Sequence, residues 1–240
     1  ATKELRKKVQ LPGMPYTCLV SKKHPQVYLS LWSSSSVLVF GGGLNTTLGT
    51  IAVGPHPNDM AESPDGKRLY VANANENSVS VIDIGSMKVT ETIVSSLFPD
   101  ALPGSTPNSV ALSSDGNTLY IANADNNYIA VMDVSSQGGS RSLGFIPSGW
   151  YPSCVRINHA NGDIIIADAK GNSSFPNPHG PMPGHKVEHM QYIGSLMKGT
   201  LEIVKQPSPG ELRAYSAQVY GNSPYRRDTA ANQQEIARLL

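Results

Sequence analysis

Tyr70-Val-Ala-Asn73 and Tyr120-Ile-Ala-Asn123 are two copies of the short apolar stretch that decides the fold. Each copy begins thirteen residues after a proline, Pro57 or Pro107. The same distance separates two further prolines from related stretches: Pro15 from Tyr28-Leu-Ser-Leu31, and Pro152 from Ile165-Ile-Ala-Asp168. Successive prolines are 42, 50 and 45 residues apart. A constant offset within a period of this size predicts four structural repeats.

Turn residues and further strands complete each repeat. Ser63-Pro-Asp-Gly66 and Ser113-Ser-Asp-Gly116 lie between the proline and the strand, and Asp-Gly supplies the positive φ that a tight hairpin requires. A polar turn and a third strand follow, as in Ser78-Val-Ser-Val-Ile-Asp83, and fourth strands are expected at 89–94 and 142–147. Short strands at this spacing are typical of propeller blades. We therefore predict an all-β fold, a β-propeller section of about four four-stranded blades with a short helical C-terminal extension.

The two complete copies, Tyr70 to Asp83 and Tyr120 to Asp133, resemble the YVTN β-propeller repeat. That repeat is found in surface-layer-type and lactonase-like seven-bladed propellers, so the resemblance implies that the four blades are part of a seven-bladed ring. The resemblance extends over residues 11–168. It is specific for the fold and leaves the function open, because propellers host many activities.

The fourth copy contains an insertion. Its expected third strand is Leu201-Glu-Ile-Val204, which places Lys205 40 residues after Ile165, whereas the matching positions in the second copy are 13 apart, so 27 residues are inserted. A loop this long in a compact domain is usually functional or disordered. We predict propeller blades over 1–205 with a long loop at 169–198, and a helical extension over 206–240.

A helix is expected over 208–221. Ser208-Pro-Gly-Glu211 is a capping box with proline at the first helical position. Leu212, Tyr215 and Val219 form an apolar stripe, and Gly221 is the expected stop. Residues 230–240 are a second candidate helix.

Several segments of the fourth copy carry a second resemblance. They are Gly149-Trp-Tyr-Pro152, Ala169-Lys-Gly171 and Tyr192-Ile-Gly-Ser-Leu-Met-Lys-Gly199, together with Ala214-Tyr215 and Asn222-Ser-Pro-Tyr225 in the tail that follows. They resemble the last propeller section of bacterial proteins that join a YVTN propeller to an alkaline-phosphatase-like phosphoesterase domain. In that family the metal ligands and the nucleophile lie in the later domain, so the resemblance assigns no catalytic residue to this chain.

Composition excludes several classes of partner. Lys plus Arg number 19 and Asp plus Glu 18, a net charge of +1, so no global field recruits nucleic acid or anionic lipid. No apolar run is long enough to span a membrane. The chain begins at Ala, as a processed mature chain or a fragment would, and we expect an extracytoplasmic location, periplasmic, cell-surface or secreted. Cys18 and Cys154 should remain unpaired, because their different offsets from proline place them on opposite faces of equivalent strands.

Candidate ligand-contacting residues lie in the turns and in the insertion. His185 and His189 are four apart and, with His179, could hold a metal, but the flanking Pro and Gly favour a polar loop. Asn75, Asn77, Asp125 and Asn127 could present oxygens to Ca²⁺ or serve only as hairpin residues. Trp150 is a candidate rim residue, and Asn73, Asn123 and Asp168 are expected to be structural strand ends. We predict no cofactor, no metal and no catalytic residue in this chain.

The function predicted from these observations is a non-catalytic binding or scaffolding propeller module of an extracytoplasmic bacterial protein. The alternative is the propeller portion of a phosphoesterase. A third possibility, a lactonase-like or redox propeller enzyme, has no supporting acid, base and metal constellation. A partial ring leaves sheet edges with unpaired backbone groups. We therefore expect a protein partner or a second copy of the chain to complete the ring or to cover its open side. The next candidates for this cover are the insertion and the helix at 208–221.

Overall fold

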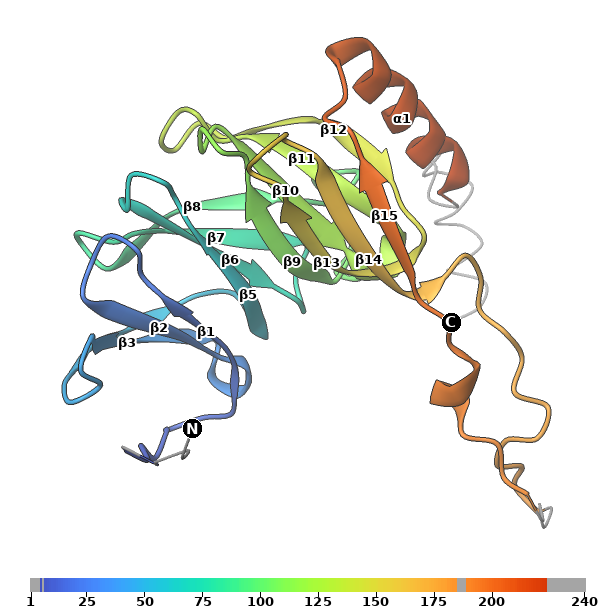
Figure 1. Ribbon diagram of the computed structural model, residues 1–240, viewed down its shortest axis with the longest axis horizontal. Helices are drawn as coiled ribbons and strands as arrows, with labels where there is room; N and C mark the ends of the chain where they lie inside the picture. The colour runs from blue at the N-terminus through green and yellow to red at the C-terminus, as the bar shows by residue number, and fades with distance from the viewer. Residues whose placement is uncertain (1–4, 6, 185–188, 224–240) are drawn as a thin grey trace.

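The computed structural model describes residues 5, 7–184 and 189–223. Its strands form four separate antiparallel sheets, each with its strands in sequence order (Figure 1). Blade 1 contains β1 (Pro15–Val20), β2 (Gln26–Leu31), β3 (Ser36–Gly41) and β4 (Thr47–Ala52). Blade 2 contains β5 (Pro57–Glu62), β6 (Arg68–Asn73), β7 (Ser78–Asp83) and β8 (Lys88–Val94). Blade 3 contains β9 (Pro107–Leu112), β10 (Thr118–Asn123), β11 (Tyr128–Asp133) and β12 (Arg141–Pro147). Blade 4 contains β13 (Trp150–Ile157), β14 (Ile164–Gly171) and β15 (Thr200–Val204).

The repeat offset is confirmed, because the four stretches thirteen residues after the prolines are all second strands, β2, β6, β10 and β14. The hairpins before the last three of them turn at Gly66, Gly116 and Gly162, with φ of 73°, 74° and 78°. A side chain at such a φ is strained, which explains why Asp-Gly and Asn-Gly occur there. Short 3-10 turns lie at Trp32–Ser34, Ala124–Asn126 and Ile193–Leu196.

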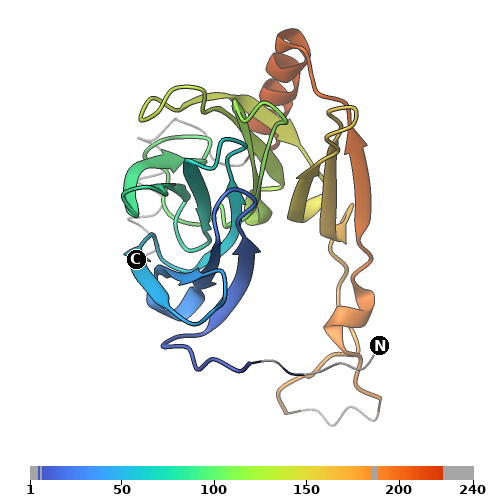
Figure 2. The same ribbon diagram turned by 60° about the vertical axis from the view of Figure 1, so that its left-hand side comes forward.

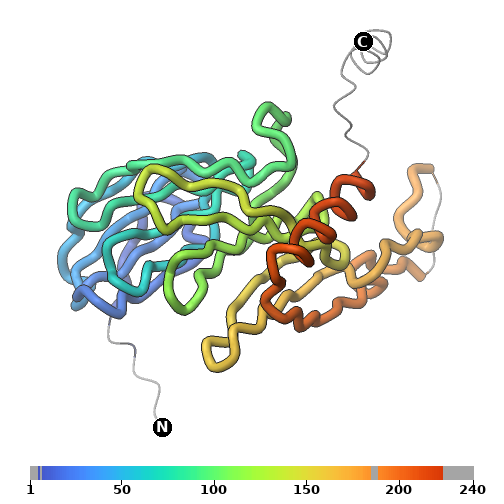
Figure 3. The backbone as a smooth tube through the Cα atoms, turned by 90° about the horizontal axis from the view of Figure 1, so that it is seen from above, coloured from blue at the N-terminus to red at the C-terminus, as the bar shows by residue number. Residues whose placement is uncertain are grey.

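The core lies between successive blades. Tyr70, Val79 and Val81 of blade 2 pack with Leu119 and Ile121 of blade 3 in one buried cluster. A second cluster joins blade 3 to blade 4, and a third joins blade 1 to blade 2. The blades therefore follow one another in a curved row (Figure 3). The first strands β1, β5, β9 and β13 are neighbours along the inner side of this row.

Blade 4 differs from the prediction of four strands in every blade. Its sheet has three strands among the described residues, β13, β14 and β15, and the predicted third strand is confirmed as β15. The described residues between β14 and β15 leave the sheet and extend away from the blades (Figure 2). Leu201 and Ile203 on β15 are 67% and 66% exposed, so one apolar face of blade 4 meets solvent.

The predicted helix is α1 (Pro209–Asn222), and its capping box is formed as expected. Leu212 and Val219 are buried. The expected stop at Gly221 was wrong: the helix continues to Asn222, and the backbone N–H of Ser223 bonds the carbonyl of Val219. The helix packs against β12 of blade 3, so it does not cover the open face of blade 4. The candidate helix at 230–240 lies outside the described residues.

Both cysteines are free thiols, as predicted. Cys18 lies opposite Leu29 in the β1–β2 pair, and Cys154 lies opposite Ala167 in the β13–β14 pair. Counted from the proline of each repeat, the positions of Leu29 and Ala167 differ by one residue. The two cysteines therefore point to opposite faces of equivalent strands. No helix in the described ranges is long and apolar enough to cross a membrane.

Candidate functional site

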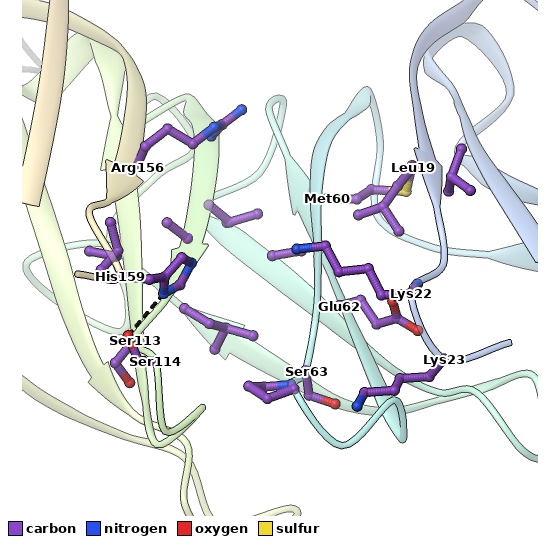
Figure 4. A pocket seen from close by; sticks show the side chains of 17 residues that line it. Leu19, Lys22, Lys23, Met60, Glu62, Ser63, Ser113, Ser114, Arg156 and His159 are labelled. Carbon is purple, nitrogen blue, oxygen red and sulfur yellow. Dashed lines mark hydrogen bonds between the residues drawn. The ribbon is translucent and has the colours of Figure 1, made fainter. Parts of the chain in front are cut away.

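The inner side of the blade row contains a pocket of about 540 Å³. Residues from all four first strands and from their hairpin turns line it (Figure 4). Leu19, Met60, Val110 and Ile157 contribute apolar surface, whereas Arg156 and His159 enter from blade 4. Because the four blades each contribute to it, this axial pocket is a property of the assembled row and of no single repeat.

Asp59 organises the wall of the axial pocket. Its Oδ2 accepts hydrogen bonds from the Ser109 hydroxyl at 2.7 Å and from Arg156 Nη1 at 2.9 Å. The same oxygen accepts from the backbone N–H of Val110, and Oδ1 accepts from that of Met60. Arg156 Nη1 also donates to the Ser109 hydroxyl at 2.8 Å. Asp59, Ser109 and Arg156 come from blades 2, 3 and 4, so one polar network joins three blades.

The charge of the pocket is predominantly positive. Lys22, Lys23 and Arg156 line it together with one carboxylate, Glu62. Glu62 is already engaged, because its oxygens accept from the Ser21 hydroxyl at 2.6 Å and from the backbone N–H of Lys22 at 2.9 Å. Burial opposes the charged form of Arg156, but the charge of Asp59 and its hydrogen bond outweigh this, so the pKa of Arg156 is raised.

The guanidinium of Arg156 has further N–H donors that are available to a ligand. All of its hydrogen bonds described above come from Nη1, and its side chain is 54% exposed. A guanidinium carries five N–H donors in a planar fork that matches a carboxylate or a phosphate. Asp59 fixes the guanidinium from behind, so the group is oriented before any ligand arrives. This arrangement suits the binding of a small anion.

A second polar pair lies at the mouth of the same pocket. The Ser114 hydroxyl and His159 Nδ1 are 2.9 Å apart. Both residues occupy exposed hairpin turns, between β9 and β10 and between β13 and β14. A hydroxyl beside an imidazole is the arrangement of a nucleophile and its base, which normally needs a third group to orient the imidazole.

The residues of the polar network occupy defined positions in the repeat, although the repeat alone does not show that they meet. Asp59 and Ser109 each lie two residues after the repeat proline, and Arg156 lies four after its own. The offset that locates the strands also marks these positions on the inner strand. Our sequence prediction considered only the turns and the insertion, so it missed all three residues.

Two of the predicted turn residues hold the links between blades. Asn77 is 8% exposed, and its amide binds four backbone groups of the loop that leads to blade 3. Asn127 occupies the same repeat position, and its Oδ1 accepts from the backbone N–H of Tyr151 at 2.9 Å, at the start of blade 4. Asn127 also has a φ of 56°, as the hairpin interpretation expects. Asn75 is exposed.

Three of the predicted residues do come together elsewhere. Asp125, Asn127 and Trp150 line a second cavity of about 510 Å³, which the last turn of α1 closes at Val219 and Asn222. Trp150 is 43% exposed, as a rim residue would be. Asp125 accepts a hydrogen bond from the Thr106 hydroxyl.

The predicted histidines are exposed as far as the structure describes them. His179 and His189 are both exposed, and His185 lies outside the described residues. The carbonyl of His179 accepts from the backbone N–H of Gln191. Within the described ranges, no group of three or more His, Cys, Asp or Glu side chains is arranged to hold a metal.

Comparison with known proteins gives the family. The family model described as "Lactonase, 7-bladed beta-propeller" matches residues 20–174, more than half of the chain. No curated protein matches this chain.

Solved structures agree on the fold. Hydrazine synthase of Kuenenia stuttgartiensis superimposes with a TM-score of 0.59 and 26% identity over 72% of this chain and 47% of that one. A protein of Bacteroides uniformis assigned as a 6-phosphogluconolactonase gives 0.58 and 20% over 65% and 47%. A Bacteroides fragilis protein with the same assignment gives 0.55 and 18% over 65% and 48%. This chain thus spans about half the length of these structures, and it belongs to the seven-bladed β-propeller lactonase family.

Proposed function

We propose that this chain is the ligand-binding part of a lactonase-type propeller and that its axial pocket binds a small ligand bearing a carboxylate or a phosphate. The supporting observation is Arg156, which Asp59 and Ser109 hold in place while more than half of its side chain stays exposed. Lys22 and Lys23 add positive charge on the facing blade. These observations support placing the binding role predicted from the sequence on the inner strands.

The hydrogen bonds that the carboxylates of Asp59 and Glu62 already accept favour a binding role over a catalytic one. Both oxygens of Asp59 and both of Glu62 already accept hydrogen bonds from the protein. A general base must be able to reach a proton of the substrate, and these two groups are committed to holding the pocket together.

Isothermal titration calorimetry with 6-phosphogluconate, gluconate and inorganic phosphate tests the proposal. Arg156→Gln should weaken binding of the preferred anion by about 10- to 100-fold, because hydrogen bonds to a charged group contribute about 1.5–3 kcal/mol. Arg141→Gln is the matched control, since Arg141 also pairs with an aspartate, Asp133, but on an outer strand. Equal affinities for the two variants, or no binding of any of the three anions, would refute the proposal.

Lactone hydrolysis is a second candidate function, favoured by the 2.9 Å contact between Ser114 and His159 in the same pocket. In this mechanism His159 takes the hydroxyl proton as Ser114 attacks the lactone carbonyl, and gives it to the ring oxygen as the acyl C–O bond breaks. A water deprotonated by His159 then hydrolyses the acyl–Ser114 ester, which releases the hydroxy acid and restores the Ser114 hydroxyl. Ser114→Ala and His159→Gln should each abolish hydrolysis of 6-phosphogluconolactone above the spontaneous rate. His189→Gln, at an exposed position of the insertion, is the control, and equal rates in all three variants would exclude the pair.

The assembly and the location of the protein also remain proposals. A protein partner or a second copy would cover blade 4, where Leu201 and Ile203 are exposed; light scattering tests this, and a stable monomer would contradict it. An extracytoplasmic location is tested by cell fractionation. The YVTN character of the repeat and the link to a phosphoesterase stay predictions, and the complete reading frame tests the latter.

A further inference from the structure

The root of the insertion in blade 4 holds two carboxylates side by side. Asp168 on β14 pairs with Thr200 on β15, and Glu202 pairs with Ile166. Side chains two residues apart on a strand share a face, so Asp168 and Glu202 are diagonal neighbours on one side of the sheet. Asp168 is 1% exposed, whereas Glu202 is half-buried. The pair is therefore buried at one end and reachable at the other.

The equivalent positions in blade 2 carry a complementary pair instead. Asn73 occupies the position of Asp168, and Ser80 that of Glu202. The Asn73 amide donates to the Ser80 hydroxyl at 3.0 Å and to the Ser78 hydroxyl at 2.9 Å. In blade 4 the amide donor and the hydroxyl acceptor are replaced by two carboxylates, Asp168 and Glu202, which both accept hydrogen bonds. A hydrogen bond between the two carboxyl groups requires one of them to be protonated.

One buried oxygen of the pair forms no hydrogen bond. Asp168 Oδ2 accepts from the Thr200 hydroxyl at 3.1 Å, and Glu202 Oε1 accepts from the backbone N–H of Gly149 at 3.0 Å. Asp168 Oδ1 is buried and forms no hydrogen bond. Burial and the charge of Glu202 raise the pKa of Asp168 to about 6. Neither residue forms an ion pair within the described part of the chain.

Backbone oxygens and glycines surround the same place. A methyl group on Gly149 would lie 2.8 Å from the carbonyl oxygen of Gly171 and 2.9 Å from Asp168 Oδ2. Both oxygens thus converge on Gly149. Gly171 has a φ of 63°, and the carbonyl oxygen of Lys198 occupies the place where a Cβ of this residue would lie. Three segments meet here: the start of blade 4 and the two ends of the insertion.

We propose that Asp168 and Glu202 form a Ca²⁺ site at the root of the insertion. Two carboxylates, the Thr200 hydroxyl and the Gly171 carbonyl are hard oxygen donors, the set that Ca²⁺ prefers, and Ca²⁺ tolerates the irregular geometry and added waters that a partly open site imposes. The bound ion neutralises the buried charge and ties both ends of the insertion to the start of blade 4. This role is separate from the axial pocket and does not rest on the function proposed for it.

Terbium(III), which replaces Ca²⁺, gives a direct test because Trp150 lies opposite Gly171 in the sheet and can sensitise its luminescence. We expect sensitised emission that Ca²⁺ displaces, with a Ca²⁺ dissociation constant of about 0.1–1 mM, the range of extracellular Ca²⁺ modules. Trp150→Phe should remove the emission but keep the Ca²⁺-dependent rise in melting temperature.

Asp168→Asn is the decisive variant, because it restores the residue type found at Asn73 and should fold. It should lose the Ca²⁺-dependent rise in melting temperature and weaken terbium binding at least tenfold, and Glu202→Gln should do the same. Asp100→Asn, at an exposed carboxylate, should behave as the unaltered protein. The proposal is wrong if the unaltered protein shows no sensitised emission with millimolar terbium, or if Asp168→Asn keeps the full Ca²⁺ effect.

Discussion

Replacing Asn77 with alanine should loosen the link between blades 2 and 3. The Asn77 amide donates to the carbonyls of Ala101 and Leu102, at 3.2 and 2.8 Å. Its Oδ1 accepts from the backbone N–H groups of Gly104 and Ser105, at 3.1 and 2.8 Å. The substitution removes all four hydrogen bonds at once.

The expected loss follows from the exposure of the partners. Ala101, Leu102 and Gly104 are exposed, so water replaces their lost partner and each bond costs at the low end of about 0.5–1.5 kcal/mol. Ser105 is 2% exposed, and an orphaned buried N–H costs about 1–3 kcal/mol. The free energy of unfolding should therefore fall by about 2.5–4.5 kcal/mol.

Urea denaturation followed by Trp fluorescence measures this change, and hydrogen exchange should show faster exchange at 101–105. Asn75→Ala is the matched control, because Asn75 is an exposed residue of the same turn and its replacement should change stability by no more than about 0.5 kcal/mol. If the two variants unfold at the same urea concentration, the inference that Asn77 is structural is refuted.

Three further outcomes are expected. Burial and the charge of Glu202 disfavour the carboxylate form of Asp168 in the fold and raise its pKa to about 6. The stability of the protein in metal-free buffer should therefore fall as the pH rises from about 4 to about 6. Asp168→Asn should remove this part of the pH dependence, and an unchanged profile would contradict the prediction. Ile166→Ala, at a fully buried position, should cost about 2–5 kcal/mol in thermal or chemical unfolding, whereas Ile203→Ala, at an exposed one, should cost less than about 0.5; similar losses would contradict the burial pattern. Ellman titration should find two free thiols after denaturation and a faster reaction of Cys18, which is exposed, than of Cys154 in the native protein.

Much of the fold follows from the sequence because hairpin geometry fixes distances along the chain. The constant offset from proline located β2, β6, β10 and β14, and pattern matching located β15 beyond the insertion. The capping box located the start of α1. The surface that α1 covers could not be predicted, since an apolar stripe does not specify which of several apolar faces it meets.

The candidate site was less accessible to sequence reasoning. Asn77 and Asn127 were predicted to present side-chain oxygens to a ligand. In the structure these oxygens accept hydrogen bonds from backbone N–H groups that lie 24–28 residues away in the sequence. The ion pair of Asp59 and Arg156 joins positions 97 residues apart. Each partner is an ordinary strand residue in its own repeat, so only the curvature of the blade row reveals their proximity.

That ion pair has a consequence for how the chain unfolds. Repeat arrays whose units touch only their neighbours lose them stepwise, from whichever end is weaker. Asp59 in blade 2 reaches past blade 3 to Arg156 in blade 4, with Ser109 between them. Blades 2, 3 and 4 share this contact, so detaching blade 4 also removes a bond from blade 2. Blade 1 lies outside the network, and we expect it to melt as a separate, earlier step while the other three blades unfold together.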